Sequence, residues 1–513
     1  MLSQTELVAE NEALKVRVQE LEKLNDWYEK QLKLNRQRMF GASSEKSEYT
    51  GMNQLNLFNE AEAEQKPISP EPTLEEITYK RRKKKGSREK LLEQLPVETI
   101  EYTLPESKQI CPRCGNSLHV MSKEIRRELK IIPAKVSVVE HVSYVYACRN
   151  CEKNDVQTPV ITAPAPKALI PKSLVSPNVM ATVMSQKFVN AMPLYRQEQE
   201  FKRLGVALSR QTFANWMIKG AQLLRPLADA MKVELLKKEV LHADETTLEV
   251  LCEPDRPAQT NSYMWLYRTS GCDVPIVLYD YEEGRSGRFA KEYLSGFKGY
   301  LHTDGWGGYH QLEECGVTLC GCWAHAKRKF NEALTVCASK QDSLEAKGLA
   351  YCTALFDIER KAEDFSKAQR HELRQKESKP IAEEFFEWAE HQLNISNTPK
   401  SPVGAAMQYA VNQKKYLLSF LEDGRIELSN NRAERSIKPF VIGRKNWLFC
   451  NTPAGAKSSA VIYSIVETAK ENGLIPYAYL NFVFEQIQSH ETVQFENLLP
   501  WSSQIPDCCK LKI

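Results

Sequence analysis

The sequence predicts a multidomain α+β protein, and three observations support this class. A leucine-rich heptad fills the first part of the chain, and two Cys-x-x-Cys pairs follow it, near residues 111 and 148. From residue 236 onward, short apolar segments typical of strands are combined with helical patterns. With 513 residues, the chain is long enough to form several domains with separate cores.

Composition restricts where the protein acts. The formal net charge is only +3, so any affinity for nucleic acid would come from local basic patches. No apolar run approaches the roughly 18 residues of a membrane span, and the N-terminus lacks the apolar segment of a signal peptide. Most of the 14 cysteines are scattered, as is typical of reduced thiols. We therefore expect a cytoplasmic protein with no membrane partner.

Residues 1–50 are expected to form a leucine-zipper-like coiled coil. The two seam positions of its heptad hold Leu7, Leu14, Leu21 and Tyr28, and Asn11, Val18, Asn25 and Leu32. Asparagine at a seam position fixes register and oligomer number, which favours self-association of the chain. The alternative is a single amphipathic helix that packs on its own chain.

Residues 51–95 predict a linker that is acidic at first and then basic. The basic part is Lys80–Lys85, a run of consecutive cations. Such a run is either a solvated spacer or a source of phosphate contacts that do not depend on base sequence.

Residues 96–158 predict a zinc-binding module. The four thiols of the two pairs suit a tetrahedral Zn²⁺ site, with Cys111, Cys114, Cys148 and Cys151 as ligands. Alternation over residues 135–148 predicts a β-strand, so the module is expected to be a zinc ribbon. Four protein ligands close the coordination sphere, which makes this zinc structural. A redox role for the pairs is the alternative, but its thioredoxin-like context is missing.

Prolines mark residues 159–178 as a stiff linker, and residues 179–235 predict a helical segment. Two helices are expected at 176–188 and 193–204, followed by a turn at Gly205 and a helix that Ser209 caps. This pattern resembles a helix-turn-helix, with Arg210, Gln211 and Asn215 as candidate DNA contacts. Plain packing of a helical domain is the alternative.

Two aspartates belong to predicted strands, Asp244 within one strand and Asp304 at the end of another. An apolar segment leads to Asp244 within residues 240–251, and another leads to Asp304 just before a glycine turn. Between them, residues 262–269 and 275–281 predict strands and residues 288–297 predict a short helix.

A third carboxylate, Glu434, lies in a predicted helix within residues 426–449. Asn430 and Asn431 are expected to cap this helix, and Pro439 is expected to limit or kink it. Cations surround Glu434, which suits a metal ligand beside a polyanion. For an isolated glutamate, intrahelical ion pairs on a solvated helix would be the alternative.

This order of strands, helices and carboxylates is similar to the ribonuclease-H-like fold of DDE nucleases and transposases. The runs HADET, TDGWGGY, GCWAHAKRKF and NNRAERSIKPFVIGRKNWLF resemble the insertion-sequence-66 family of bacterial transposases, and the resemblance spans nearly the whole chain. It implies that Asp244, Asp304 and Glu434 are a catalytic triad that holds two Mg²⁺ or Mn²⁺ ions. It also implies accessory proteins of the same element and a place at the bacterial nucleoid.

The resemblance places the catalytic core at residues 236–330 and 420–466. The stretch from Asp304 to Glu434 is longer than a compact core needs, so residues 331–419 are expected to be a helical insertion. Residues 467–513 are expected to be a C-terminal helical segment. Cys322 and His325 form a Cys-x-x-His motif that would need two further metal ligands, and packing is the preferred role. His325 could instead orient the scissile phosphate.

Side chains near the triad have different expected roles. The candidate DNA contacts are Arg328, Lys329, Arg435, Lys438, Arg444, Lys445 and Trp447, the last of which could equally be a core residue. Strand alternation directs Glu245 away from Asp244, so it is not expected to be a ligand. His242 and His302 are expected to pack beside the aspartates.

The leading hypothesis is therefore a DNA transposase that acts on double-stranded DNA, at its element's terminal repeats and in the target. A sequence-specific DNA-binding regulator is one alternative, although it leaves the three carboxylates unexplained. A DNA nuclease without strand transfer is the other, since it would use the same triad.

Overall fold

The computed structural model describes residues 135–147, 160–164, 166–337, 343–395 and 401–511, with a few isolated positions among the first 32 residues. The chain divides into two compact units, Ser43–Ser137 and the remainder, and nearly all described residues belong to the second. Nearly all of the predicted coiled coil lies outside the described residues, as do the linker with its basic run and the four zinc-ligand cysteines.

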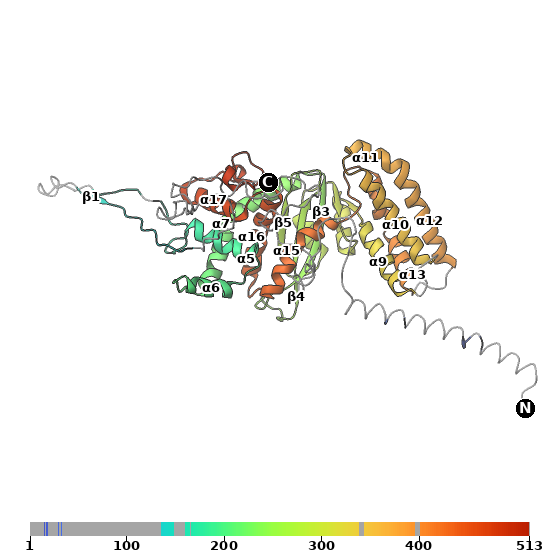
Figure 1. Cartoon of the computed structure of the whole chain (residues 1–513), viewed down its shortest axis with the longest axis horizontal. Helices are drawn as coiled ribbons and strands as arrows, with labels where there is room; N and C mark the ends of the chain where they lie inside the picture. The colour runs from blue at the N-terminus through green and yellow to red at the C-terminus, as the bar shows by residue number, and fades with distance from the viewer. Residues whose placement is uncertain are drawn as a thin grey trace, which may run out of the picture. The chain divides into compact units, whose positions relative to one another are not determined.

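A five-stranded mixed sheet forms the centre of the second unit (Figure 1). Its strands are β3 (Val240–Glu249), β4 (Asn261–Thr269), β5 (Val277–Glu282), β6 (Tyr300–His302) and β7 (Thr318–Cys320). The spatial order is β5-β4-β3-β6-β7. The first three strands pair antiparallel, while β6 pairs parallel with β3 and β7 parallel with β6. Strands β3, β4, β5 and β6 confirm the apolar segments predicted from the sequence.

The directions of the strands follow from their connections. Loops without a helix, at residues 250–260 and 270–276, join β3, β4 and β5, as antiparallel neighbours allow. The parallel step to β6 requires a crossover, which contains α8 (Gly287–Tyr293) and confirms the predicted short helix. The central strand β3 therefore lies beside β6, and their register places His242 opposite His302.

Helices from both ends of the unit cover the β5 side of the sheet. They are α5 (Pro177–Phe188), α6 (Leu194–Arg203), α7 (Arg210–Leu236), α16 (Pro453–Glu471) and α17 (Pro476–Ser489). The α16 helix packs against β5 and α7, and α17 packs against α5. Ser209 caps α7 as predicted, but the helix continues to Leu236 through Pro226. The α16 helix begins at Pro453, where the side chain of Thr452 caps it.

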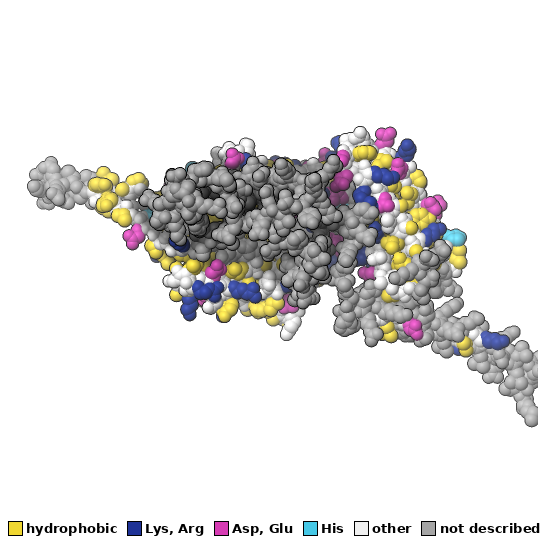
Figure 2. All heavy atoms as spheres, viewed as in Figure 1, with side chains coloured by type: hydrophobic (Ala, Val, Ile, Leu, Met, Phe, Trp, Pro, Cys, Tyr) yellow, Lys and Arg dark blue, Asp and Glu magenta, His cyan; other side chains and the backbone are white. Residues whose placement is uncertain are grey.

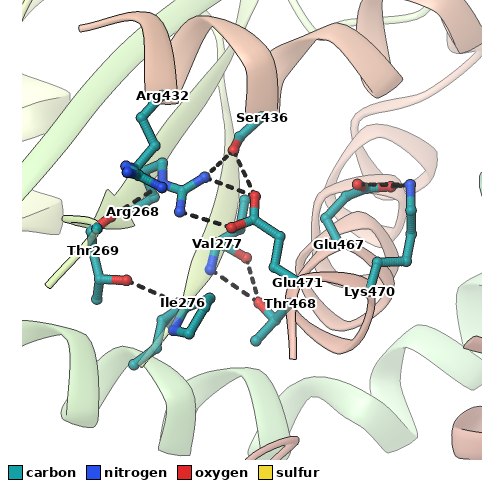
Figure 3. A network of polar contacts seen from close by, with 12 residues as sticks. Arg268, Thr269, Ile276, Val277, Arg432, Ser436, Glu467, Thr468, Lys470 and Glu471 are labelled. Carbon is teal, nitrogen blue, oxygen red and sulfur yellow. Dashed lines mark hydrogen bonds and ion pairs between the residues drawn. The ribbon is translucent and has the colours of Figure 1, made fainter. Parts of the chain in front are cut away.

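The α16 helix also completes the hydrogen bonding of the sheet edge. Strand β5 is an edge strand, so the outward backbone groups of Val277 and Tyr279 have no neighbouring strand. The N–H of Val277 donates to Thr468 Oγ1 at 3.0 Å, and the N–H of Tyr279 donates to Ser464 Oγ at 2.8 Å. Figure 3 shows the bonds between Thr468 and Val277. Two hydroxyls of a helix thus protect the edge from pairing with another strand.

The stretch between β7 and α15 (Asn431–Trp447) is helical. It contains α9 (Trp323–Val336), α10 (Leu344–Lys361), α11 (Lys367–Leu373), α12 (Lys379–Ile395), α13 (Pro402–Asn412) and α14 (Lys414–Leu418). The remaining helical elements are the 3₁₀ helices η2 (Gly307–Cys315), η4 (Ser419–Leu421), η5 (Phe495–Leu498) and η6 (Asp507–Cys509), and the π-helical segment η3 (Arg374–Ser378). The helices share an aromatic cluster, in which Trp323, Phe330 and Phe385 are fully buried. This cluster is distinct from the core that covers the sheet.

The strand predicted at residues 135–148 is mostly absent. Only β1 (Val145–Ala147) is a strand, and it pairs antiparallel with β2 (Val160–Thr162). Apolar side chains before it, such as Val138 and Val139, are 88% and 72% exposed. Figure 2 shows hydrophobic side chains along this ribbon. Alternation over residues 135–144 predicted a longer strand, but these residues have no described strand to pair with.

Candidate active site

Asp244 lies in the middle of the central strand β3. Its Oδ1 accepts a hydrogen bond from the backbone N–H of Glu245 at 2.9 Å. Burial raises the pKa of Asp244 well above its ordinary value, and the nearby carboxylates of Glu245 and Asp304 raise it further. A carboxylate in this environment is stabilised in its charged form by any cation that binds beside it.

Asp304 lies two residues beyond the end of β6, in the predicted glycine turn. Its Oδ1 accepts from the backbone N–H of Trp306 at 2.9 Å, which holds the side chain in place. Gly305 has φ +89°, a conformation that favours glycine. The helical stretch supports this turn, because the Tyr409 hydroxyl on α13 donates to the carbonyl of Asp304 at 3.2 Å.

Glu434 lies in the first turn of α15, as predicted. Arg328 on α9 donates to Glu434 Oε2 at 3.3 Å, and His325 Nε2 is 3.8 Å from Oε1. That Oε1 atom is buried and has no hydrogen-bond partner among the described residues. The predicted capping by Asn430 was wrong, because Asn430 precedes α15 without a side-chain capping bond. Pro439 does not end the helix, since α15 runs for 17 residues, so of its two predicted effects only a kink stays a prediction.

The three carboxylates converge on one cavity of about 280 Å³. It is lined by Asp244, Asp304, His325, Glu434, Ile437 and Lys438. The carboxylates come from a strand, a turn and a helix that are far apart in the sequence. This arrangement is unfavourable unless positive charge is present, for two reasons. Asp244 is buried and the carboxylates repel one another, and Glu434 has a buried oxygen without a hydrogen-bond partner among the described residues. The residues therefore fit a hard divalent cation with oxygen ligands.

The Cys-x-x-His motif joins this site through Glu434. One potential ligand atom from each of Cys322, His325 and Glu434 lies within 4.8 Å of the other two. The sequence alone indicated no further partner for the motif, because Glu434 lies more than a hundred positions away. The Cys322 sulfur accepts from the backbone N–H of Asn430 at 3.1 Å, and burial raises the pKa of this thiol to about 12. Cys322 is therefore packed and hydrogen-bonded as a neutral thiol.

Glu245 lies outside the cavity lining, as strand alternation predicted. Its carboxylate pairs with Arg285 at 2.5 Å and accepts from the Tyr309 hydroxyl at 2.5 Å. Arg285 also lies 3.7 Å from Asp304 Oδ2, and its guanidinium is 4.6 Å from the ring centroid of Trp306. Sequence reasoning missed Arg285, because a single arginine in a loop has no recognisable pattern.

The predicted DNA contacts on α9 and α15 fall into two groups. Lys438 lines the cavity and Arg328 pairs with Glu434, so these two lie at the site. The others lie outside the cavity lining. Arg435 and Lys445 are exposed, and the Lys329 ammonium lies over the ring of Tyr409. Arg444 donates to the hydroxyls of Thr246 and Thr247, while Trp447 is partly buried and packs against Phe440.

The predicted contacts on α7 are all exposed. Arg210, Gln211 and Asn215 occupy its first two turns, while Phe213 and Trp216 between them are buried. The preceding helix α6 adds exposed cations that sequence reasoning did not single out, namely Arg196, Lys202 and Arg203. Figure 2 shows basic side chains gathered over this part of the chain.

Among the described residues, no helix is both long enough and apolar enough to cross a membrane.

Comparison with known proteins assigns the chain to a family. Residues 172–458 match a family model described as Transposase IS66 family, and residues 108–152 match a zinc-finger binding domain of transposase IS66. Residues 464–501 match an IS66 C-terminal element, and residues 27–100 match a model described as Transposase C of IS166 homeodomain. The zinc-finger match contains all four predicted zinc ligands.

Similar proteins occur in Sinorhizobium fredii. The uncharacterized protein y4qI is 32% identical over 420 residues, which cover 79% of this chain and 75% of the relative. The uncharacterized protein y4hP is 29% identical over 423 residues, which cover 78% and 74%. Four family models along the chain and relatives of this extent agree. The chain belongs to the IS66 family of transposases, enzymes that act on DNA.

Proposed function

We propose that the chain cleaves DNA at the ends of its own insertion sequence and joins those ends to target DNA. In this proposal Asp244, Asp304 and Glu434 hold two Mg²⁺ or Mn²⁺ ions. The observation that carries it is the convergence of these three carboxylates on one cavity. The strand order β5-β4-β3-β6-β7, with β6 and β7 parallel to β3, supports a ribonuclease-H-like core.

Two divalent ions, when bound, would polarise the scissile phosphate and stabilise the attacking and leaving oxygens. The residues of the chain position the DNA and neutralise its charge. Lys438 presents an ammonium group to the cavity, where a phosphate would gain a charge-assisted hydrogen bond. Arg328 now neutralises Glu434, and it becomes available to phosphate when a cation takes its place.

The proposed reaction has two in-line displacements. Water attacks the phosphorus at the element end, the bond to the 3′-oxygen breaks, and a free 3′-hydroxyl remains. That hydroxyl then attacks a phosphorus of the target and displaces a target 3′-oxygen. No covalent protein intermediate is required, and the described lining of the cavity contains no Ser, Thr, Tyr or Cys that could form one.

Other parts of the chain would hold the DNA and pair the protomers. The exposed residues Arg210, Gln211 and Asn215 would enter a groove, with the cations of α6 on the backbone. A structural Zn²⁺ held by the four cysteines would stabilise a module that grips the ends. The N-terminal coiled coil would bring two protomers, and therefore two ends, together. Accessory proteins of the element would complete the assembly.

A labelled duplex with the element's terminal repeat tests the proposal. The wild-type chain with Mg²⁺ or Mn²⁺ should release a 3′-hydroxyl at the end and join it to a target plasmid. Asp304→Asn should bind the duplex but neither cut nor join it. If both proteins bind and neither cuts, the regulator hypothesis gains support. If wild type cuts but never joins, the chain is a nuclease.

A further inference from the structure

Asn430 connects the elements that carry the carboxylates. It is fully buried, and its amide lies against the central strand. Oδ1 is 2.9 Å from His242 Nδ1, and Nδ2 donates to the carbonyl of Ala243 at 2.8 Å. Its backbone N–H donates to the sulfur of Cys322, and its carbonyl accepts the N–H of Glu434 at 3.2 Å. All the polar groups of Asn430 thus link β3, the start of α9 and the first turn of α15.

A second connection joins the same loop to β6. His302 Nε2 donates to the carbonyl of Glu427 at 2.9 Å, and the Glu427 carboxylate accepts from Arg432 at 2.7 Å. The His302 ring stacks on that of His242, with centroids 5.1 Å apart and planes 7° apart. The loop from Glu427 to Asn430 therefore contacts both strands, in each case two residues before an aspartate of the triad.

The amide orientation of Asn430 determines the tautomer of His242. Because Nδ2 donates to a carbonyl, Oδ1 faces the imidazole and accepts the Nδ1 proton. His242 Nε2 and His302 Nδ1 are buried and have no hydrogen-bond partner in the described part of the chain, which suits neutral rings. These histidines are packing residues, and Asn430 is the residue that fastens the loop to β3.

We propose that Asn430 is a positioning residue that sets the place of the Glu434 carboxylate relative to Asp244, and thereby the affinity of the site for divalent cations. The inference rests on the proposed function, since it assumes that these carboxylates bind the metal. Asn430 contacts the residue before Asp244 and the backbone of Glu434 itself. Other contacts of α15, from Ser436 to Arg268 and from Arg444 to Thr246, lie further along the helix. Loss of the amide should therefore loosen the first turn while the helix stays docked.

The test compares Asn430→Ser and Asn430→Ala with a matched control. Serine can still cap a helix, so Asn430→Ser removes both bonds to β3 but leaves a suitable residue before α15. The control is Asn472→Ala. The Asn472 amide also joins a helix to the strand side, donating to the carbonyls of Pro275 and Thr468 at 2.7 and 2.8 Å, but it lies outside the cavity lining.

Mn²⁺ affinity is measured on the purified zinc-loaded chain by calorimetry and electron paramagnetic resonance. Thermal melting in the absence of Mn²⁺ shows how far each variant is destabilised. Residues that orient metal ligands typically contribute about 10- to 100-fold in affinity. We expect both Asn430 variants to bind Mn²⁺ at least about tenfold more weakly, and Asn472→Ala to bind like wild type even if it melts earlier. Wild-type affinity in both Asn430 variants would overturn the inference, as would an equal loss in Asn472→Ala.

Asp304→Asn separates this inference from the proposed function. If Asp304→Asn loses Mn²⁺ binding and the Asn430 variants do not, only the role of Asn430 is wrong. If Asp304→Asn binds Mn²⁺ like wild type, the carboxylates are not the metal site and the proposed function fails with the inference.

Discussion

Removing the charge of Glu471 should destabilise the chain more than most single substitutions. Glu471, at the end of α16, accepts two hydrogen bonds from Arg268 on β4, at 2.7 and 2.8 Å (Figure 3). Ser436 on α15 bonds to both partners. The side chain of Arg268 is 2% exposed and that of Glu471 is 33% exposed. The pair therefore joins a strand and two helices with one almost fully buried charge.

The expected loss of unfolding free energy follows from the different burial of Arg268 and Glu471. A hydrogen bond to a charged group contributes about 1.5–3 kcal/mol, and breaking a buried pair costs about 3–5 kcal/mol. Glu471 is one-third exposed, so solvent screening reduces its share. Glu471→Gln leaves the Arg268 guanidinium buried without a counter-charge, and we expect a loss of about 3 kcal/mol. Arg268→Met with Glu471→Gln should lose less than Glu471→Gln alone, because no buried charge then remains.

Urea unfolding followed by tryptophan fluorescence measures these differences. Asp229→Asn is the matched control, because Asp229 pairs with Arg225 where both side chains are more than half exposed. Such a pair contributes about 0–1 kcal/mol. The reasoning fails if Glu471→Gln unfolds within about 1 kcal/mol of wild type. It also fails if the double variant is less stable than Glu471→Gln.

Three further predictions concern pH, packing and zinc. Burial and then Asp280 raise the pKa of Glu282 to about 7, so the folded carboxyl holds its proton more tightly than the unfolded one. The stability that the protonated carboxyl contributes is therefore lost as the pH rises from about 4.5 to 7. Glu282→Gln stays uncharged, so its melting temperature should be higher than that of wild type at pH 8 and equal to it near pH 4.5. Gly348→Ala should lower the free energy of unfolding in urea by about 1–3 kcal/mol, because a Cβ there would lie 2.3 Å from the Phe330 ring. An unchanged free energy of unfolding would show that the ring can move away. Cys111→Ser should lower the zinc content measured by atomic emission, whereas exposed Cys272→Ser should not.

The sequence predicted the sheet well because its strands carry their own signals. Each contains a short apolar segment, which leads to Asp244 within one strand and to Asp304 at a glycine turn after another. Glu434 was placed in a helix because residues that are good helix caps in isolation stand before it, although Asn430 makes no side-chain capping bond. These features are local, so chain order and periodicity were enough to predict them.

Contacts between distant segments could not be predicted in the same way. Asn430 is a good capping residue in isolation, yet its amide bonds to β3, nearly two hundred positions earlier. Arg285 belongs to the site because of Glu245 and Asp304, and nothing around it in the sequence indicates this. The strand predicted at 135–148 is mostly absent because, among the described residues, only 145–147 have a strand to pair with, and strand propensity alone does not make a sheet.

Mobility in cells tests the central claim most directly. The protein is supplied with a marker flanked by its terminal repeats and with the neighbouring reading frames of the element. Wild type should move the marker, while Asp304→Asn and Glu434→Gln should abolish movement and still bind the ends. If either variant moves the marker as often as wild type, the three carboxylates do not form the catalytic site.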